Sequence, residues 1–186
     1  MTSEADAPGF ALRLDASDFA LFELPLRFAQ DRALIDARWK ALMARMHPDR
    51  FAAAGAQAQC EAMQWALRVN QAYVRLKKPL ARAAYLCELH GQAVDAETNT
   101  AMPAAFLMQQ MAWREALADA ATVGAVEAIA AAVAAAERRI LDALASLLDE
   151  RRDWVAAAAE VRALMFLARF GQALEQRLEA LHERAG

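Results

Sequence analysis

Apolar residues along the first half of the chain recur at the spacing of amphipathic α-helices. Between residues 31 and 46 one stripe contains Ile35 and the apolar residues four, seven and eleven positions after it, Trp39, Leu42 and Met46. A second stripe begins after Gln57 and contains Ala62, Ala66, Val69, Tyr73 and Leu76. This pattern predicts two long helices, each with one buried face.

A proline separates these two helices. Pro48 follows His47 directly, and a proline excludes the preceding residue from the α region while its own ring clashes with the preceding helical turn. We therefore expect His47-Pro48-Asp49-Arg50 to begin a loop that also includes Gly55. A short connection between two helices predicts that they pack antiparallel as a hairpin.

Shorter elements flank the hairpin. Residues 1–16 lack a helical apolar period, so we expect a mobile tail there. A short helix should begin at Asp18, which can serve as its N-cap, and end by Pro25. Another should run from Pro79 to His90, with Gly91 just past its end.

The second half of the chain predicts a separate helical domain. The stretch 92–101 is polar and has no periodicity, which indicates a linker between domains at 17–91 and 102–186. Three helical segments then follow near 103–120, 124–148 and 152–183. Short connections between them favour an antiparallel three-helix bundle, so the predicted fold class is all-α.

Composition supports helices and argues against several functions. Alanine, which favours helix, accounts for much of the 58% hydrophobic content. A formal net charge of -3 offers no positive field for nucleic acid. No stretch approaches the roughly 20 apolar residues that span a bilayer, and the acidic N-terminus is unlike a secretory signal. We expect a cytoplasmic protein that binds neither nucleic acid nor membrane.

The candidate chemistry for an enzyme is sparse. Cys60 and Cys87 stand alone without the spacing of a zinc or redox motif, and no phosphate loop, nucleophile elbow or HExxH occurs. An enzyme using His47, Asp49 and a distant Cys or His90 stays open as an alternative. We expect no catalytic residue, metal site or cofactor.

The sequence around the predicted hairpin resembles the J-domain over residues 17–91. The resemblance rests on His47-Pro48-Asp49 at the turn and on Trp39, Leu42, Asn70, Tyr73, Leu76, Pro79, Arg82 and Tyr85. It implies that His47, Pro48 and Asp49 contact a DnaK-class ATPase. The basic residues that the resemblance places around this contact are Arg38, Lys40, Arg45 and Arg50. A solvated surface is the other interpretation of these charges.

Later segments resemble the HscB family of J-domain co-chaperones. These segments are residues 79–91 and residues 105–117. The resemblance implies two partners, the chaperone HscA and the iron–sulfur scaffold protein IscU, and a monomer is expected. It also implies that the C-terminal bundle binds the scaffold through Leu107, Met108, Met111, Arg114, Glu115, Asp119 and Phe166.

The residues of the first C-terminal helix support a binding surface independently of the resemblance. Phe106, Trp113 and Leu117 form one stripe, and Leu107, Met108 and Met111 form another on roughly the opposite side. One helix of a three-helix bundle needs only one buried stripe, and methionines adapt well to a docked chain. The alternative interpretation of this second stripe is that it is ordinary core. The alternative function is that of a J-domain co-chaperone for a different client.

Overall fold

The computed structural model describes residues 13–94, 102 and 104–185, and every regular element among them is helical. Contacts divide the chain into two compact units, Met1–Arg82 and Ala83–Gly186. The predicted all-α fold class is confirmed. Most of the predicted linker, at 95–101, and residues 1–12 of the predicted tail lie outside the described residues.

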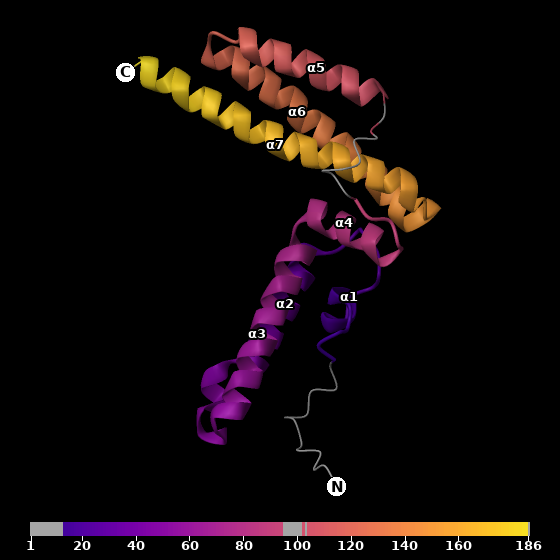
Figure 1. Cartoon of the computed structure of the whole chain (residues 1–186), viewed down its shortest axis with the longest axis vertical. Helices are drawn as coiled ribbons and strands as arrows, with labels where there is room; N and C mark the ends of the chain where they lie inside the picture. Colours follow the sequence, from indigo (N-terminus) through magenta and orange to yellow (C-terminus); the bar gives the residue numbers. More distant parts are fainter. Residues whose placement is uncertain (1–12, 95–101, 103, 186) are drawn as a thin grey trace. The chain divides into compact units, whose positions relative to one another are not determined.

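The N-terminal unit is built on a helical hairpin. Helices α2 (Arg32–Met46) and α3 (Ala56–Lys77) lie side by side, with α1 (Asp18–Leu21) beside α3 (Figure 1). The predicted apolar stripes supply the core, since Ile35, Met46, Val69 and Leu76 are all fully buried. The periodicity of these two helices therefore predicted both their extent and their packing face.

The start of α1 differs from the prediction. Ser17 is the N-cap, and its hydroxyl accepts the backbone N–H of Ala20. Asp18 is instead buried, with its carboxylate 2.7 Å from Nη1 of Arg68 and 3.4 Å from Nη1 of Arg75. The cap prediction was wrong because the alternative partners of Asp18 lie some fifty residues away in the sequence.

Arg68 also fixes the end of the segment that was predicted as a tail. Its Nε donates to the carbonyl of Leu14 over 3.1 Å, and its Nη2 donates to the carbonyl of Ala16 over 2.7 Å. Residues 13–16 therefore contact α3.

The division between the two units falls inside α4 (Pro79–Leu89), earlier than the expected boundary at 92–101. Arg82, at the end of the first unit, is buried and donates to the carbonyls of Phe28 and Leu76. The second half of α4, from Ala83 to Cys87, is buried as well. The division therefore falls between a buried arginine and a buried apolar run of the same helix, with no loop to mark it.

The end of α4 follows the prediction. Gly91 has a φ of +75°, a left-handed conformation that glycine adopts without strain. The N–H of Gln92 donates to the carbonyl of Cys87, which is the pattern that closes many helices. His90, which follows the last residue of α4, stacks on Trp154 with ring centroids 3.6 Å apart.

The C-terminal unit contains the predicted three long helices. Helices α5 (Ala104–Asp119), α6 (Val123–Ala145) and α7 (Trp154–Ala185) lie side by side (Figure 1). A π-helical segment, Ser146–Arg151, continues α6, so the connection to α7 is shorter than residues 149–152 suggested. The core contains Trp113 of α5, Val126 and Leu144 of α6, and Leu167 of α7.

Candidate functional site

The proline after His47 ends α2 as predicted. His47 has an extended backbone, with φ -64° and ψ 126°, and the chain then forms a 3-10 helical segment, η1 (Pro48–Ala54), before Gly55 leads into α3. Gly55 has a φ of +96°, which favours glycine at this turn. The tripeptide His47-Pro48-Asp49 therefore lies at the tip of the hairpin.

Both polar side chains of this tripeptide face solvent. The side chain of His47 is 54% exposed and that of Asp49 is 88% exposed, with 3.5 Å between His47 Nδ1 and Asp49 Oδ2. The backbone N–H of Asp49 donates to His47 Nδ1 over 3.3 Å, so a neutral ring accepting this bond carries its proton on Nε2. The exposed carboxylate of Asp49 is then available as an acceptor for a donor on another molecule.

The four basic residues expected around this loop have different surroundings. Nη1 of Arg38 lies 2.6 Å from Oε2 of Glu23, and Nη1 of Arg50 donates to the carbonyl of Ala44 near the end of α2. Lys40 and Arg45 are exposed on α2. The Arg38–Glu23 pair is itself largely exposed, and such pairs contribute at most about 1 kcal/mol, so it can exchange partners at small cost.

Polar and aromatic contacts hold the two hairpin helices in register behind the loop. The rings of Trp39 and Tyr73 stack with centroids 4.8 Å apart, and the Trp39 indole N–H donates to Asn70 Oδ1. The Tyr73 hydroxyl donates to Asp36 Oδ1 over 2.9 Å. This hydroxyl, followed by Arg32, lowers the pKa of Asp36 below its ordinary value. These contacts hold together the two helices that the loop connects.

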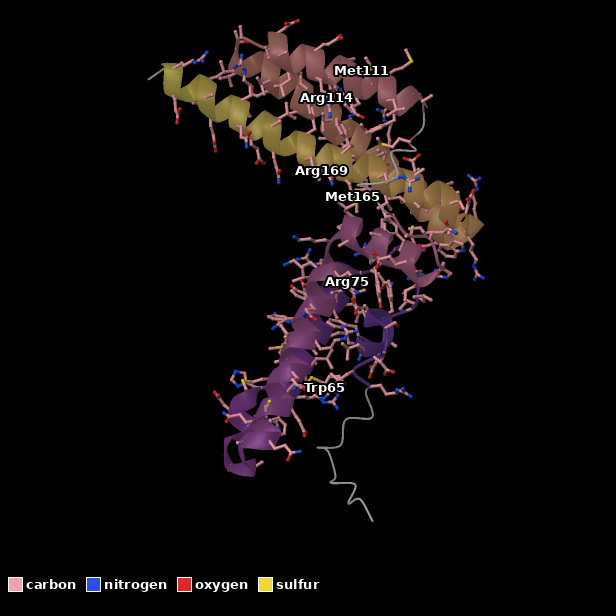
Figure 2. All side chains as sticks on the ribbon, in the orientation of Figure 1. Trp65, Arg75, Met111, Arg114, Met165 and Arg169 are labelled. Carbon is pink, nitrogen blue, oxygen red and sulfur yellow. The ribbon has the colours of Figure 1, made fainter. Side chains whose placement is uncertain are left out.

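Helix α5 carries the two apolar faces that the sequence predicted. Trp113 is buried at 5% exposure, whereas Leu107, Met108 and Met111 are exposed by 39%, 74% and 64%. Figure 2 shows Met111 and Arg114 along this helix. The alternative interpretation of this stripe as ordinary core is wrong, since three large apolar side chains face solvent on one helix.

A cluster of aromatic rings supports the edge of this surface. Phe166 of α7 contacts Phe106 edge-on at 5.8 Å and stacks on Phe170 at 5.8 Å. The guanidinium of Arg114 lies 5.3 Å from the centre of the Phe166 ring. Of the expected scaffold-binding residues, the structure therefore brings Arg114 and Phe166 into contact, while Glu115 and Asp119 are exposed farther along α5.

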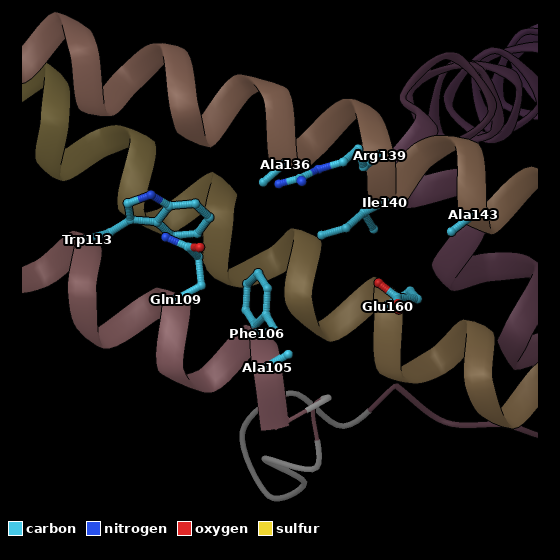
Figure 3. A pocket seen from close by; sticks show the side chains of 9 residues that line it. All are labelled: Ala105, Phe106, Gln109, Trp113, Ala136, Arg139, Ile140, Ala143 and Glu160. Atoms are coloured by element: carbon cyan, nitrogen blue, oxygen red, sulfur yellow. The ribbon is translucent and has the colours of Figure 1, made fainter.

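The sequence did not indicate two hollows at the edges of α5. One, of about 350 Å³, is lined by Arg114, Leu117, Phe166, Arg169, Phe170 and Ala173. The other, of about 360 Å³, lies between α5, α6 and α7, where Phe106, Trp113, Arg139 and Glu160 line it (Figure 3). Partial burial raises the pKa of Glu160 above its ordinary value. The periodicity of the sequence did not single out Arg169 or Glu160, because the surroundings of these two α7 residues depend on which helix packs beside α7.

The part of the chain that the structure describes offers neither a metal cluster nor a membrane-spanning helix. It contains no group of three or more His, Cys, Asp and Glu side chains placed to hold a metal ion. It also contains no helix with the length and apolarity needed to cross a bilayer.

Comparison with known protein families and structures agrees with this architecture. Residues 102–175 match the family described as the HSCB C-terminal oligomerisation domain. The co-chaperone protein HscB homolog of Burkholderia multivorans is 48% identical over 171 residues, covering 90% of this chain and 97% of that protein. The homolog from Bordetella petrii is 47% identical over 157 residues, covering 84% of this chain and 92% of its own length.

Two solved structures extend the similarity to the fold. The chaperone HscB from Vibrio cholerae has 35% sequence identity and a TM-score of 0.75, covering 89% of this chain and 99% of that chain. The human co-chaperone protein HscB has 26% identity and a TM-score of 0.83, covering 90% of this chain and 84% of that chain. The resemblance predicted from the sequence is confirmed, and the chain belongs to the HscB family of co-chaperones.

Proposed function

We propose that this co-chaperone stimulates the ATPase of a DnaK-class chaperone, HscA, and delivers the iron–sulfur scaffold protein IscU to it during cluster assembly in the cytoplasm. The single observation that carries the proposal is that each compact unit exposes a surface suited to binding a partner. One is the His47-Pro48-Asp49 loop, and the other, termed here the α5 surface, comprises Leu107, Met108, Met111, Arg114, Glu115, Asp119 and Phe166.

The chaperone contact is supported by the chemistry of the loop. Asp49 exposes its carboxylate at the tip of the hairpin and suits a basic side chain on the ATPase. A charge pair that becomes desolvated at an interface costs roughly 2–5 kcal/mol to truncate. The proposed contact also includes His47, Pro48 and the basic residues Arg38, Lys40, Arg45 and Arg50. Arg50 contributes mainly through its hydrogen bond to the carbonyl of Ala44 near the end of α2.

The scaffold contact is supported by the apolar part of the α5 surface. The α5 surface exposes the large apolar side chains of Leu107, Met108 and Met111. Exposing neighbouring apolar side chains does not stabilise the fold and is typical of interaction sites. Methionine side chains are flexible and polarizable, so they adapt to the contours of a docked protein. The mechanism is binding at two sites and requires no nucleophile, metal or cofactor from this chain.

The scaffold contact is tested by isothermal titration of purified IscU into the wild type and into the Met108→Ser/Met111→Ser double variant. We expect the double variant to lose at least about tenfold in affinity, since each buried methionine contributes roughly 1.5–3 kcal/mol. Met63→Ser is the matched control, because Met63 is 53% exposed on α3. Unchanged affinity in the double variant would contradict the proposed scaffold surface.

The alternative is a J-domain co-chaperone with another client. It is favoured if the wild type stimulates the chaperone ATPase while IscU neither binds to it nor adds to the stimulation.

A further inference from the structure

The hollow between α5 and α7 differs in character from the methionine stripe beside it. Its floor is apolar, formed by Leu117, Phe170 and Ala173, and Phe170 is only 6% exposed. Arg114 on α5 and Arg169 on α7 also line it, and both are exposed (Figure 2). None of its six lining residues is acidic. The hollow therefore combines an apolar base with two positive charges.

The aromatic cluster holds one of these arginines in place. The Arg114 guanidinium lies over the Phe166 ring at 5.3 Å, and Phe166 itself is stacked on Phe170. A guanidinium held over an aromatic ring by a cation–π contact still has N–H groups that can bind a carboxylate in two-point fashion. Arg114 is therefore oriented before a ligand arrives, which reduces the ordering cost of binding.

Neither arginine is neutralised internally. Within the part of the chain that the structure describes, neither Arg114 nor Arg169 forms an ion pair, and the acids of the same surface lie elsewhere on α5. Successive residues of a helix are rotated by about 100°, so Glu115 projects well away from the side on which Arg114 lies. The α5 surface is thus basic along its α7 edge and acidic on its outer side.

We propose that this hollow binds an acidic side chain of the scaffold protein, in a segment where the carboxylate neighbours an apolar residue. The apolar residue would pack on Leu117 and Phe170, and the carboxylate would lie between Arg114 and Arg169. The inference rests on the proposed scaffold role and adds Arg169 to it as a specificity-determining residue. Because the two sides of the α5 surface carry opposite charges, this contact also fixes the orientation of the docked protein.

The test is isothermal titration of purified IscU into the full chain carrying Arg169→Gln, Arg114→Gln or Arg169→Lys. We expect each glutamine variant to weaken binding about tenfold or more, since hydrogen bonds to charged groups are worth roughly 1.5–3 kcal/mol. Arg169→Lys should recover part of the loss, because it keeps the charge without the two-point geometry. The wild-type advantage should shrink as the salt concentration rises from about 0.05 M to about 0.5 M.

Arg138→Gln is the matched control, since Arg138 is exposed on α6 and lies outside this hollow. Normal affinity in Arg169→Gln, together with lost affinity in Met108→Ser/Met111→Ser, would overturn this inference and leave the proposed function intact. Failure of the wild type to bind IscU would overturn both. Loss of inorganic phosphate binding or of self-association in Arg169→Gln, with unchanged IscU affinity, would assign the hollow to another occupant and likewise overturn the inference.

Discussion

Asp18 is a buried acidic residue of the N-terminal unit. Its side chain is 1% exposed, and Arg68 and Arg75 supply the opposing charges. Removing one partner of a buried ion pair costs roughly 3–5 kcal/mol, because the remaining charge is left uncompensated. Both arginines keep some solvent contact, which reduces that cost.

We therefore expect Asp18→Ala to lower the free energy of unfolding by about 2–3 kcal/mol. Chemical denaturation measures the change, and Asp15→Ala is the control because Asp15 is exposed. Equal stability of the two variants would show that the ion pairs of Asp18 do not stabilise the N-terminal unit.

Glu160 gives the C-terminal unit a pH-dependent stability. Burial raises its pKa in the folded state, so ionising it at neutral pH disfavours folding, and this cost disappears as the pH falls below the folded pKa. Glu160→Gln should therefore raise the midpoint of thermal unfolding at pH 7 and have no effect below about pH 4. A variant that is less stable at pH 7, or equally stabilised at both values, would contradict this account.

At the scale of single helices, α5 has one buried face and one exposed apolar face. Trp113 is buried among Phe106 and Phe170, whereas Met108 is 74% exposed. Trp113→Ala should cost about 3–5 kcal/mol in the free energy of unfolding through the cavity it leaves. Met108→Ser should change that free energy by less than about 0.5 kcal/mol. Denaturant unfolding compares them, and a similar loss in both would refute the two-faced helix.

The elements that could be predicted from the sequence are those with a repeated local signal. The apolar stripes of α2 and α3 predicted both helices, Pro48 predicted the end of α2, and Gly91 predicted the end of α4. The surplus stripe of Leu107, Met108 and Met111 predicted an exposed face. Each of these follows from the preferences of residues within a few turns of one another.

Features that depend on distant partners could not be predicted in the same way. The burial of Asp18 requires Arg68 and Arg75 from another helix, and the division inside α4 depends on which residues each half packs against. The pairing of Arg114 with Phe166, and the place of Arg169 beside them, depend on how α5 and α7 are packed. Local periodicity contains none of this information.

For the whole molecule, the proposed function requires two binding events on one chain. The His47-Pro48-Asp49 loop belongs to the N-terminal unit and the α5 surface to the C-terminal unit, and we propose that the first binds an ATPase and the second a client. The stimulation of ATP hydrolysis by the client should then depend on this chain, because the chain raises the local concentration of client at the chaperone.

The most direct test is single-turnover ATP hydrolysis by HscA with wild-type protein or with Asp49→Ala, each with and without IscU. We expect wild-type protein to accelerate hydrolysis and IscU to increase the rate further, whereas Asp49→Ala should stimulate hydrolysis at least about tenfold less. Since the side chain of Asp49 is 88% exposed, the Asp49→Ala variant should keep the stability and the IscU affinity of the wild type. Full stimulation by a folded Asp49→Ala variant would contradict the central claim.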